Sequence, residues 1–276
     1  MFRFIILLCL LSPLPAWAQT PPEQQYSFGV VPQQSAKRLA QLWSPIFNYL
    51  YKETGIRLRF ATAKNIPEFE KKLAEGTYDF AYMNPYHFTV FNQAPGYKAV
   101  AVRNKQPIRG IVVVRKDSPL TSLQELEGKR LAFPSPAAFA ASVLPRAELD
   151  KQKINYQKQY VSSHDSVYLN VAKGLFAAGG GVNRTLNNTA PEVRQQLKVL
   201  WKTEAYTPHA IAAHPKIDKT LRDKLATAFS KMHESPEGKT LLQSLKIKHQ
   251  FIAADDAKWD DVRGLGIDLL NRLIAN

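Results

Sequence analysis

The sequence has only one cysteine and no apolar run long enough to cross a bilayer, which requires about 18–20 residues. The longest apolar run near the N-terminus, Phe4–Leu11, follows Arg3 and precedes Ala16-Trp17-Ala18, an A-x-A cleavage site. We therefore expect a cleaved signal peptide at residues 1–18, with a membrane anchor as the alternative. Cys9 lies inside this segment, so the mature chain would have no disulfide and no thiol chemistry. An exported chain of this size without cysteine resembles a bacterial periplasmic protein, and we expect that location.

Several motifs of catalysis and cofactor binding are also missing. The sequence contains no Walker loop, no nucleotide-binding glycine motif and no His/Cys cluster with metal-ligand spacing, so we expect no metal and no cofactor. Acidic residues are in the minority, with 23 Asp and Glu against 37 Lys and Arg and a net charge of +14. The basic residues are scattered, which argues against nucleic acid as a partner and favours attraction of a small anion.

The remaining sequence alternates between strand and helix patterns, which predicts an α/β fold. The first series comprises strands at 26–32, 56–62, 79–84, 98–103 and 108–116, with helices at 66–74 and 86–92. Another helix in this series has apolar residues at three- and four-residue steps from Leu39 to Leu50 and is stopped by Gly55. The second comprises helices at 123–127, 137–149 and 166–173 and strands at 130–133, 157–161, 175–179 and 198–201, before two or three helices between 219 and 274. No Gly/Ser linker divides the two series. Two interleaved lobes joined by hinge strands, with a ligand in the cleft, fit this pattern.

Four ordered segments identify a family: YSFGVVPQQSAKRLAQLWSPIFNYLYKETG, LAEGTYDFAYMNPYHF, IRGIVVVRKDSPLTSLQELEGKRLAFPSP and SSHDSVYLNVAKGLFAAGGGVN. The chain resembles the phosphate/phosphite/phosphonate-binding family, the periplasmic solute-binding components of ABC transporters. The resemblance implies the type II two-lobed periplasmic-binding-protein fold. We expect lobe 1 at 26–114, lobe 2 at 115–206, and a return to lobe 1 with C-terminal helices at 207–276.

The resemblance also implies ligand-binding residues at strand ends and helix starts. In YDFAYMNPYHF it assigns Tyr82, Asn84 and Tyr86 to the cleft, although buried aromatic residues commonly pack in a core. Gln33, just after the first strand, lies at the expected cleft edge and has a side-chain amide. His164 matches a histidine at a helix start, where it can donate to an oxyanion; the alternative is an exposed side chain beside a Ser163 or Asp165 cap.

The stretch FPSPAAFAAS departs from the family pattern. Relatives carry a Ser-Thr-Ser type run that grips the phosphonate, whereas this chain has Ala138, Phe139 and Ala140. The backbone amides remain, so we expect Ala138, Phe139 and Ala140 to bind the ligand as well. Ser135 with Pro136 is typical of an ordinary helix cap. A second departure is Ala177, at a position where the family often has an acidic residue. An acidic residue there would pair with an amine-bearing ligand. Both differences argue against phosphonate specifically and leave the binding fold intact.

The resulting functional prediction is a periplasmic solute-binding protein that captures a small phosphonate- or phosphite-like oxyanion, or a related solute, for an ABC permease. We expect a monomer and no catalysis, because neighbouring residues such as Ser163, His164 and Asp165 rarely converge into a nucleophile–base–orienter chain. The alternatives are a ligand sensor that contacts the ectodomain of a sensor kinase, or an enzyme acting in the cleft.

Overall fold

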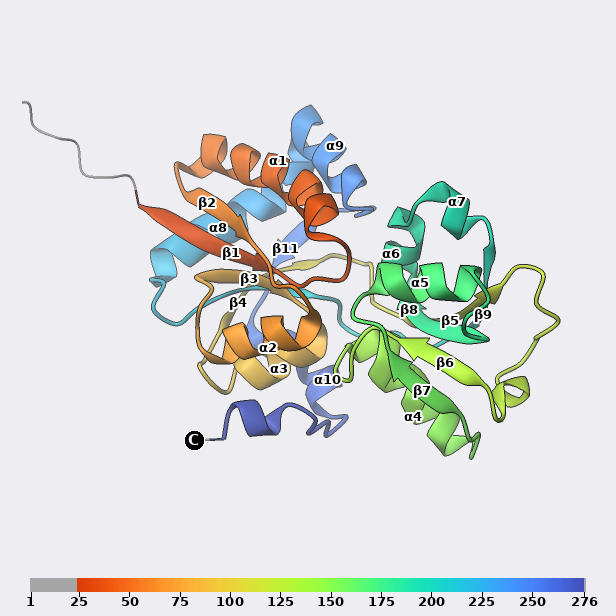
Figure 1. Cartoon of the computed structure of the whole chain (residues 1–276). Coiled ribbons are helices and arrows are strands. Elements are labelled where there is room, and N and C mark those ends of the chain that lie inside the picture. The colour runs from red at the N-terminus through yellow and green to blue at the C-terminus, as the bar shows by residue number, and fades with distance from the viewer. Residues whose placement is uncertain (1–23, 276) are drawn as a thin grey trace, which may run out of the picture.

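The computed structural model describes residues 24–275, which form two lobes side by side (Figure 1). The expected signal peptide, residues 1–18, and its cleavage site lie outside this range. No helix within the described range is long and apolar enough to cross a membrane.

Lobe 1 is built on a six-stranded mixed sheet with the order β11-β4-β10-β3-β1-β2. Its first three strands pair in parallel, whereas β10 runs antiparallel to both β3 and β4, and β11 is antiparallel to β4. The strands are β1 (Gln25–Val30), β2 (Arg57–Ala61), β3 (Phe80–Met83), β4 (Lys98–Arg103), β10 (Ala210–Ala213) and β11 (Phe251–Ala253).

Helices cover both faces of this sheet. In Figure 1, α1, α8 and α9 lie above it and α2, α3 and α10 below it. Their bounds are α1 (Ala36–Thr54), α2 (Ile66–Ala74), α3 (Pro85–Phe91), α8 (Lys219–Lys231), α9 (Pro236–Ser244) and α10 (Asp260–Arg263). Ser35 caps α1 by accepting a hydrogen bond from Arg38 N, and Gly55 ends the helix in the left-handed conformation, with φ of 70°.

Lobe 2 is built on a five-stranded sheet with the order β7-β6-β8-β5-β9. Figure 1 shows α5, α6 and α7 on one face and α4 on the other. The bounds are β5 (Gly110–Arg115), β6 (Arg130–Phe133), α4 (Leu144–Lys151), β7 (Gln157–Tyr160), α5 (His164–Ala172), β8 (Ala178–Val182), α6 (Asn183–Asn188), α7 (Pro191–Arg194) and β9 (Leu197–Lys202).

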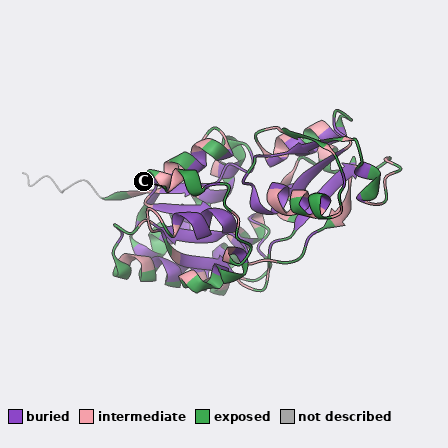
Figure 2. Ribbon diagram, turned by 90° about the horizontal axis from the view of Figure 1, so that it is seen from below, coloured by how far each residue is buried: buried purple, intermediate pink, exposed green. Residues whose placement is uncertain are grey.

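The interior strand β5 shows why this sheet needs helices on both faces. Ile111 and Val113 pack into the cluster under α5, while Val112 and Val114 pack into a second cluster under α4. Successive side chains of a strand point to opposite faces, so an unbroken Val/Ile run is buried on both sides. Figure 2 shows the same arrangement in both lobes, with buried strands inside exposed helices.

Two chain crossings join the lobes. The first, residues 104–109, leads from β4 to β5, and the second, residues 203–209, leads from β9 to β10. They pair through an antiparallel bridge in which Ile108 N donates to Tyr206 O at 2.8 Å and Tyr206 N donates to Ile108 O at 3.0 Å. The expected boundary at residue 114 falls within β5, a strand of the second sheet. We therefore propose the two crossings as the lobe boundaries.

The expected α/β two-lobed fold is confirmed, and several elements match their predicted ranges, among them α2, β4 and β6.

Three expectations about individual elements were wrong. The strand expected at 175–179 is β8 at 178–182, because its glycines conceal a strand pattern. The helix expected at 137–149 begins with a π-helical turn, η2 (Phe139–Val143), since Pro145 has no N–H to donate to Ala141 O. The helical C-terminal segment contains the short strand β11.

Candidate ligand-binding site between the lobes

A small cavity lies where the lobes meet, and six of the eight predicted site residues line it. Its volume is about 10 Å³, which is room for about one water molecule. The predicted residues that line it are Gln33, Asn84, Ala138, Phe139, Ala140 and His164. Gln33 and Asn84 follow the lobe 1 strands β1 and β3, whereas the other four come from lobe 2, so both lobes build the site.

The lobe 2 wall of this cavity is a segment that we call the alanine turn, residues 137–141. All five of its residues are at most 4% exposed and belong to the hydrophobic core of lobe 1. The Phe139 ring meets Tyr206 of the second crossing edge to face, with 5.5 Å between ring centroids. Where the family resemblance implies hydroxyl groups, this chain therefore has an apolar segment that packs between the two lobes.

Two glycines allow the alanine turn to sit directly on the lobe 2 sheet. A Cβ added to Gly110 of β5 would overlap Ala140 O, and one added to Gly180 of β8 would overlap Ala141 O. Only glycine at these two positions permits so close an approach of the two backbones. The expected cap at Ser135 is wrong, because the Ser135 hydroxyl is buried and has no hydrogen-bond partner among the described residues.

The backbone at the start of η2 keeps free donors beside the cavity. Within the described chain, no hydrogen bond satisfies the N–H groups of Phe139, Ala140 and Ala141. Consecutive N–H groups at a helix start are suited to bind an anion. The site thus lacks hydroxyl donors but retains amide donors.

Direct contacts hold the lobes together across the site. His164 N donates to Gln33 O at 3.0 Å, and Asn84 Nδ2 donates to Ala137 O at 3.3 Å. Arg184 also donates to the side-chain carbonyl of Gln33. Residues that we expect to contact a ligand from opposite lobes therefore form hydrogen bonds with residues of the other lobe. The structure accordingly represents a closed form.

His164 is the first residue of α5 and is 1% exposed, which rules out the alternative of an exposed side chain. Its Nδ1 lies 3.1 Å from Thr185 Oγ1, and Ser163 supplies the helix cap. Burial, with a smaller effect of Arg184, lowers the pKa of His164 to about 3. His164 is therefore a neutral hydrogen-bonding group at neutral pH.

His164 and Asp165 turn to different partners. The Asp165 carboxylate accepts hydrogen bonds from Ser35 N at 3.3 Å and from Gln34 Nε2 at 3.4 Å, both in lobe 1. Burial raises the pKa of Asp165, and these two hydrogen bonds oppose that shift. Asp165 thus fastens lobe 2 to the start of α1 and does not orient the neighbouring histidine.

Two of the predicted site residues, Tyr82 and Tyr86, do not line this cavity. Tyr82 stacks on His209 with 4.9 Å between ring centroids, and the Arg184 guanidinium lies 5.8 Å from the Tyr82 ring centroid. Tyr86 is 1% exposed in lobe 1, and its hydroxyl accepts a hydrogen bond from Leu270 N at 2.9 Å. The structure thus brings Tyr82 to the lobe junction but engages Tyr86 with the C-terminal segment.

Sequence reasoning missed Arg184 and His209 as site residues. His209 lies in the second crossing, lines the cavity and is 1% exposed. Arg184 lies in α6 and reaches Gln33 of the other lobe. A polar residue in a hinge segment could have drawn attention to His209, but only the packing of the lobes reveals the role of Arg184.

Comparisons with known proteins agree with this architecture. The family described as "ABC transporter, phosphonate, periplasmic substrate-binding protein" matches residues 28–259. The phosphonates-binding periplasmic protein of Escherichia coli K12 is 25% identical over 273 residues, covering 94% of this chain and 80% of that protein.

Two solved structures share the fold. A binding protein component of an ABC phosphonate transporter from Pseudomonas aeruginosa has a TM-score of 0.79 and 19% identity, covering 91% of this chain and 88% of that one. PhnD1 of Prochlorococcus marinus, solved in complex with methylphosphonate, has a TM-score of 0.79 and 18% identity, covering 88% of this chain and 97% of that one.

Proposed function

Because the chain belongs to the family of periplasmic substrate-binding proteins of phosphonate ABC transporters, we propose that it captures a small oxyanion between its lobes. Members of this family bind a solute and deliver it to an ABC transporter. In this chain the oxyanion would lie in the inter-lobe cavity, between Gln33 and Asn84 of lobe 1 and the alanine turn and His164 of lobe 2.

The observation that carries this proposal is that residues of both lobes converge on one cavity. A ligand that contacts both walls stabilises the closed form by its differential affinity for that form. The free N–H groups of η2 and the amides of Gln33 and Asn84 are suited to an oxyanion. The 10 Å³ cavity cannot hold a tetrahedral anion, so we expect the lobes to open or the alanine turn to shift before binding.

We propose a mature monomer in the periplasm that docks its closed form on an inner-membrane ABC permease. A sensor kinase ectodomain would recognise the same closed form, and copurification from membranes distinguishes these partners. We propose no catalytic role, which is supported by the separate hydrogen-bond partners of His164 and Asp165.

A thermal-shift screen tests the proposal, using phosphate, phosphite, methylphosphonate, aminoethylphosphonate and short organic acids. A ligand at about 100 times its Kd should stabilise the protein by about 2.7 kcal/mol. For the ligand that binds, His164→Ala should weaken affinity by about 1–3 kcal/mol because one buried hydrogen-bonding group is lost.

His233→Ala is the matched control, since His233 lies between α8 and α9 and does not line the cavity. Equal affinity of the His164→Ala variant and the control would place His164 outside the site. No stabilisation by any of these solutes would contradict the proposed capture of a small oxyanion.

A further inference from the structure

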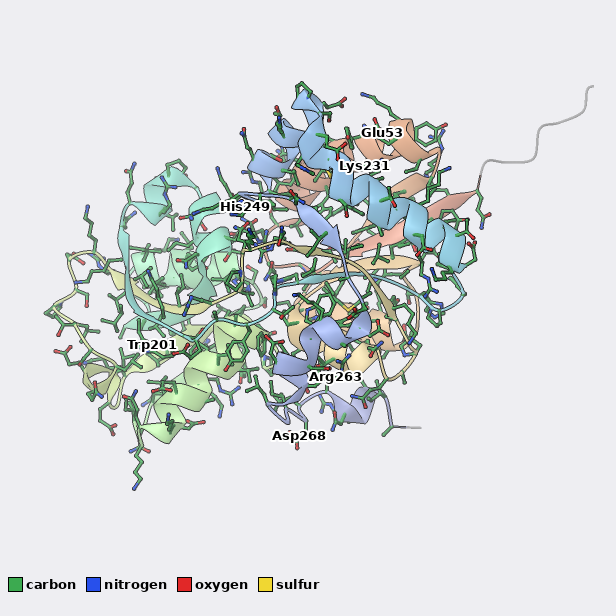
Figure 3. All side chains as sticks on the ribbon, turned by 180° about the vertical axis from the view of Figure 1, so that it is seen from behind. Glu53, Trp201, Lys231, His249, Arg263 and Asp268 are labelled. Carbon is green, nitrogen blue, oxygen red and sulfur yellow. The ribbon has the colours of Figure 1, made fainter. Side chains whose placement is uncertain are left out.

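A second, much larger cavity opens beside the inter-lobe cavity, and its walls are strongly basic. Its volume is about 800 Å³, within the range of small-molecule sites. Its charged lining consists of three arginines and four lysines: Arg103, Arg109, Arg184, Lys105, Lys202, Lys246 and Lys248. No aspartate or glutamate of residues 24–275 lines it. Figure 3 labels His249, another residue that lines this cavity, at the junction of the two lobes.

Arg103 is the strongest indication that this cavity takes an anion. Its side chain lies at the end of β4 and is 6% exposed, and its Nε has no hydrogen-bond partner. No ion pair joins Arg103 to another residue of the described chain. A buried guanidinium without a counter-charge is costly, and an anion in the cavity would compensate it. Burial, with a further effect of Arg184, lowers the pKa of Arg103.

His209 provides an independent indication. It is 1% exposed, and both of its ring nitrogens lack a hydrogen-bond partner in the described chain. Its ring lines both cavities and is held by stacking on Tyr82. An unpaired buried polar group at a cavity wall is the group that a ligand is expected to satisfy.

The two lobes share the walls of this basic cavity. Arg103 and Lys248 belong to lobe 1, whereas Arg184 and Lys202 belong to lobe 2. Cations that face one another across the junction repel, and a ligand of several negative charges would convert that repulsion into attraction. One monoanion would leave most of the seven positive charges uncompensated.

We propose that the basic cavity binds a polyphosphorylated small molecule, with Arg103, Arg184 and His209 holding its phosphate groups and the lysines surrounding them. Arginine suits this role because its planar fork matches two phosphate oxygens. The proposal rests on the proposed function in taking the lobe junction as the place where anions bind. It adds a second site there, beside the small cavity, for a ligand larger and more highly charged than a phosphonate. Because no aspartate or glutamate of residues 24–275 lines the basic cavity, an amine-bearing ligand would find no counter-charge there.

Isothermal titration calorimetry of the mature protein tests this proposal with inorganic triphosphate, adenosine triphosphate, phosphate, methylphosphonate and citrate. We expect triphosphate to bind at least about ten-fold more tightly than phosphate, with an affinity that falls steeply as salt is added. Equal or tighter binding of adenosine triphosphate would identify a ligand with an organic body. Weaker binding of adenosine triphosphate would identify an inorganic polyphosphate, and either result supports the class.

Substitutions of residues that line the basic cavity test where triphosphate binds. Arg103→Gln should weaken triphosphate binding about ten-fold or more, because a charge-assisted contact is lost. The double variant Lys202→Gln/Lys248→Gln changes exposed residues, so it should fold even where Arg103→Gln does not, and it should weaken binding several-fold. Lys158→Gln, on the edge strand β7, makes the same charge change outside the cavity and should leave binding unaltered.

Three results would overturn the inference: triphosphate no tighter than phosphate, citrate as tight as triphosphate, or a double variant as tight as Lys158→Gln. Methylphosphonate binding that depends on His164, together with no triphosphate binding that depends on Arg103, would uphold the proposed function while rejecting this inference. Failure of every probe would also reject the inference, and the wider solute screen would then decide the proposed function.

Discussion

His164 is 1% exposed at the junction of the two lobes, and this burial sets its protonation state in the closed form. Its pKa falls to about 3, because burial penalises the imidazolium, as does the neighbouring positive charge of Arg184. The unfolded chain has the ordinary histidine pKa of about 6.5. Below that pH the unfolded chain gains a proton that the closed form does not accept until about pH 3.

The stabilising contribution of neutral His164 should therefore be complete above about pH 6.5 and decline as the pH falls toward about 3. Between about pH 7.5 and pH 5, the wild-type protein should lose up to about 2 kcal/mol more unfolding free energy than His164→Gln, which cannot titrate. Urea unfolding at both pH values measures this difference. The same pH dependence in both proteins would show that His164 is already solvated before unfolding.

The alanine turn and strand β8 form one packed unit, because the Ala141 carbonyl lies where any side chain at Gly180 would begin. Gly180→Ala should destabilise the protein by about 1–3 kcal/mol through overpacking. Chemical unfolding measures this loss. Gly264→Ala is the matched control, since its added Cβ would only touch Asp260 O at 3.4 Å. The idea fails if the two substitutions cost the same.

The chemistry of the alanine turn predicts weak phosphonate binding. Ala138 and Ala140 provide no side-chain donors, and each lost hydrogen bond is worth about 0.5–1.5 kcal/mol. Ala138→Ser/Ala140→Ser should therefore strengthen methylphosphonate binding about ten-fold or more. Calorimetry compares the two proteins. Sub-micromolar binding of methylphosphonate to the wild-type chain would contradict this prediction and show that backbone amides alone account for most of the affinity.

At the scale of the whole molecule, the first prediction concerns export. We expect the mature chain to begin near Gln19, because Ala16-Trp17-Ala18 follows a short apolar run. Mass spectrometry of the exported protein measures the cleavage point. An intact leader or a lipid adduct on the purified protein would contradict cleavage at this site.

The sequence was sufficient for the two-lobed fold, and residues predicted from it in both lobes line the small cavity, but it did not indicate the charges beside that cavity. Patterns of strand and helix are local, so β4 and α2 could be predicted from periodicity. The glycine-rich β8 was misplaced because its close packing against Val167 and Tyr168 leaves no hydrophobic pattern along the chain. Arg103, Arg184 and His209 meet only through the packing of both lobes, and no spacing in the sequence indicates that meeting.

The Tyr82 ring that stacks on His209 also packs against Trp43, whose ring is tilted by 48° and has its centroid 4.8 Å from that of Tyr82. Trp259 Nε1 also donates to Pro208 O at 2.7 Å, next to His209 in the chain. Two indole rings are thus coupled to His209, which lines both cavities. The unlabelled protein carries its own optical reporter, and its intrinsic fluorescence should change as a ligand reaches His209.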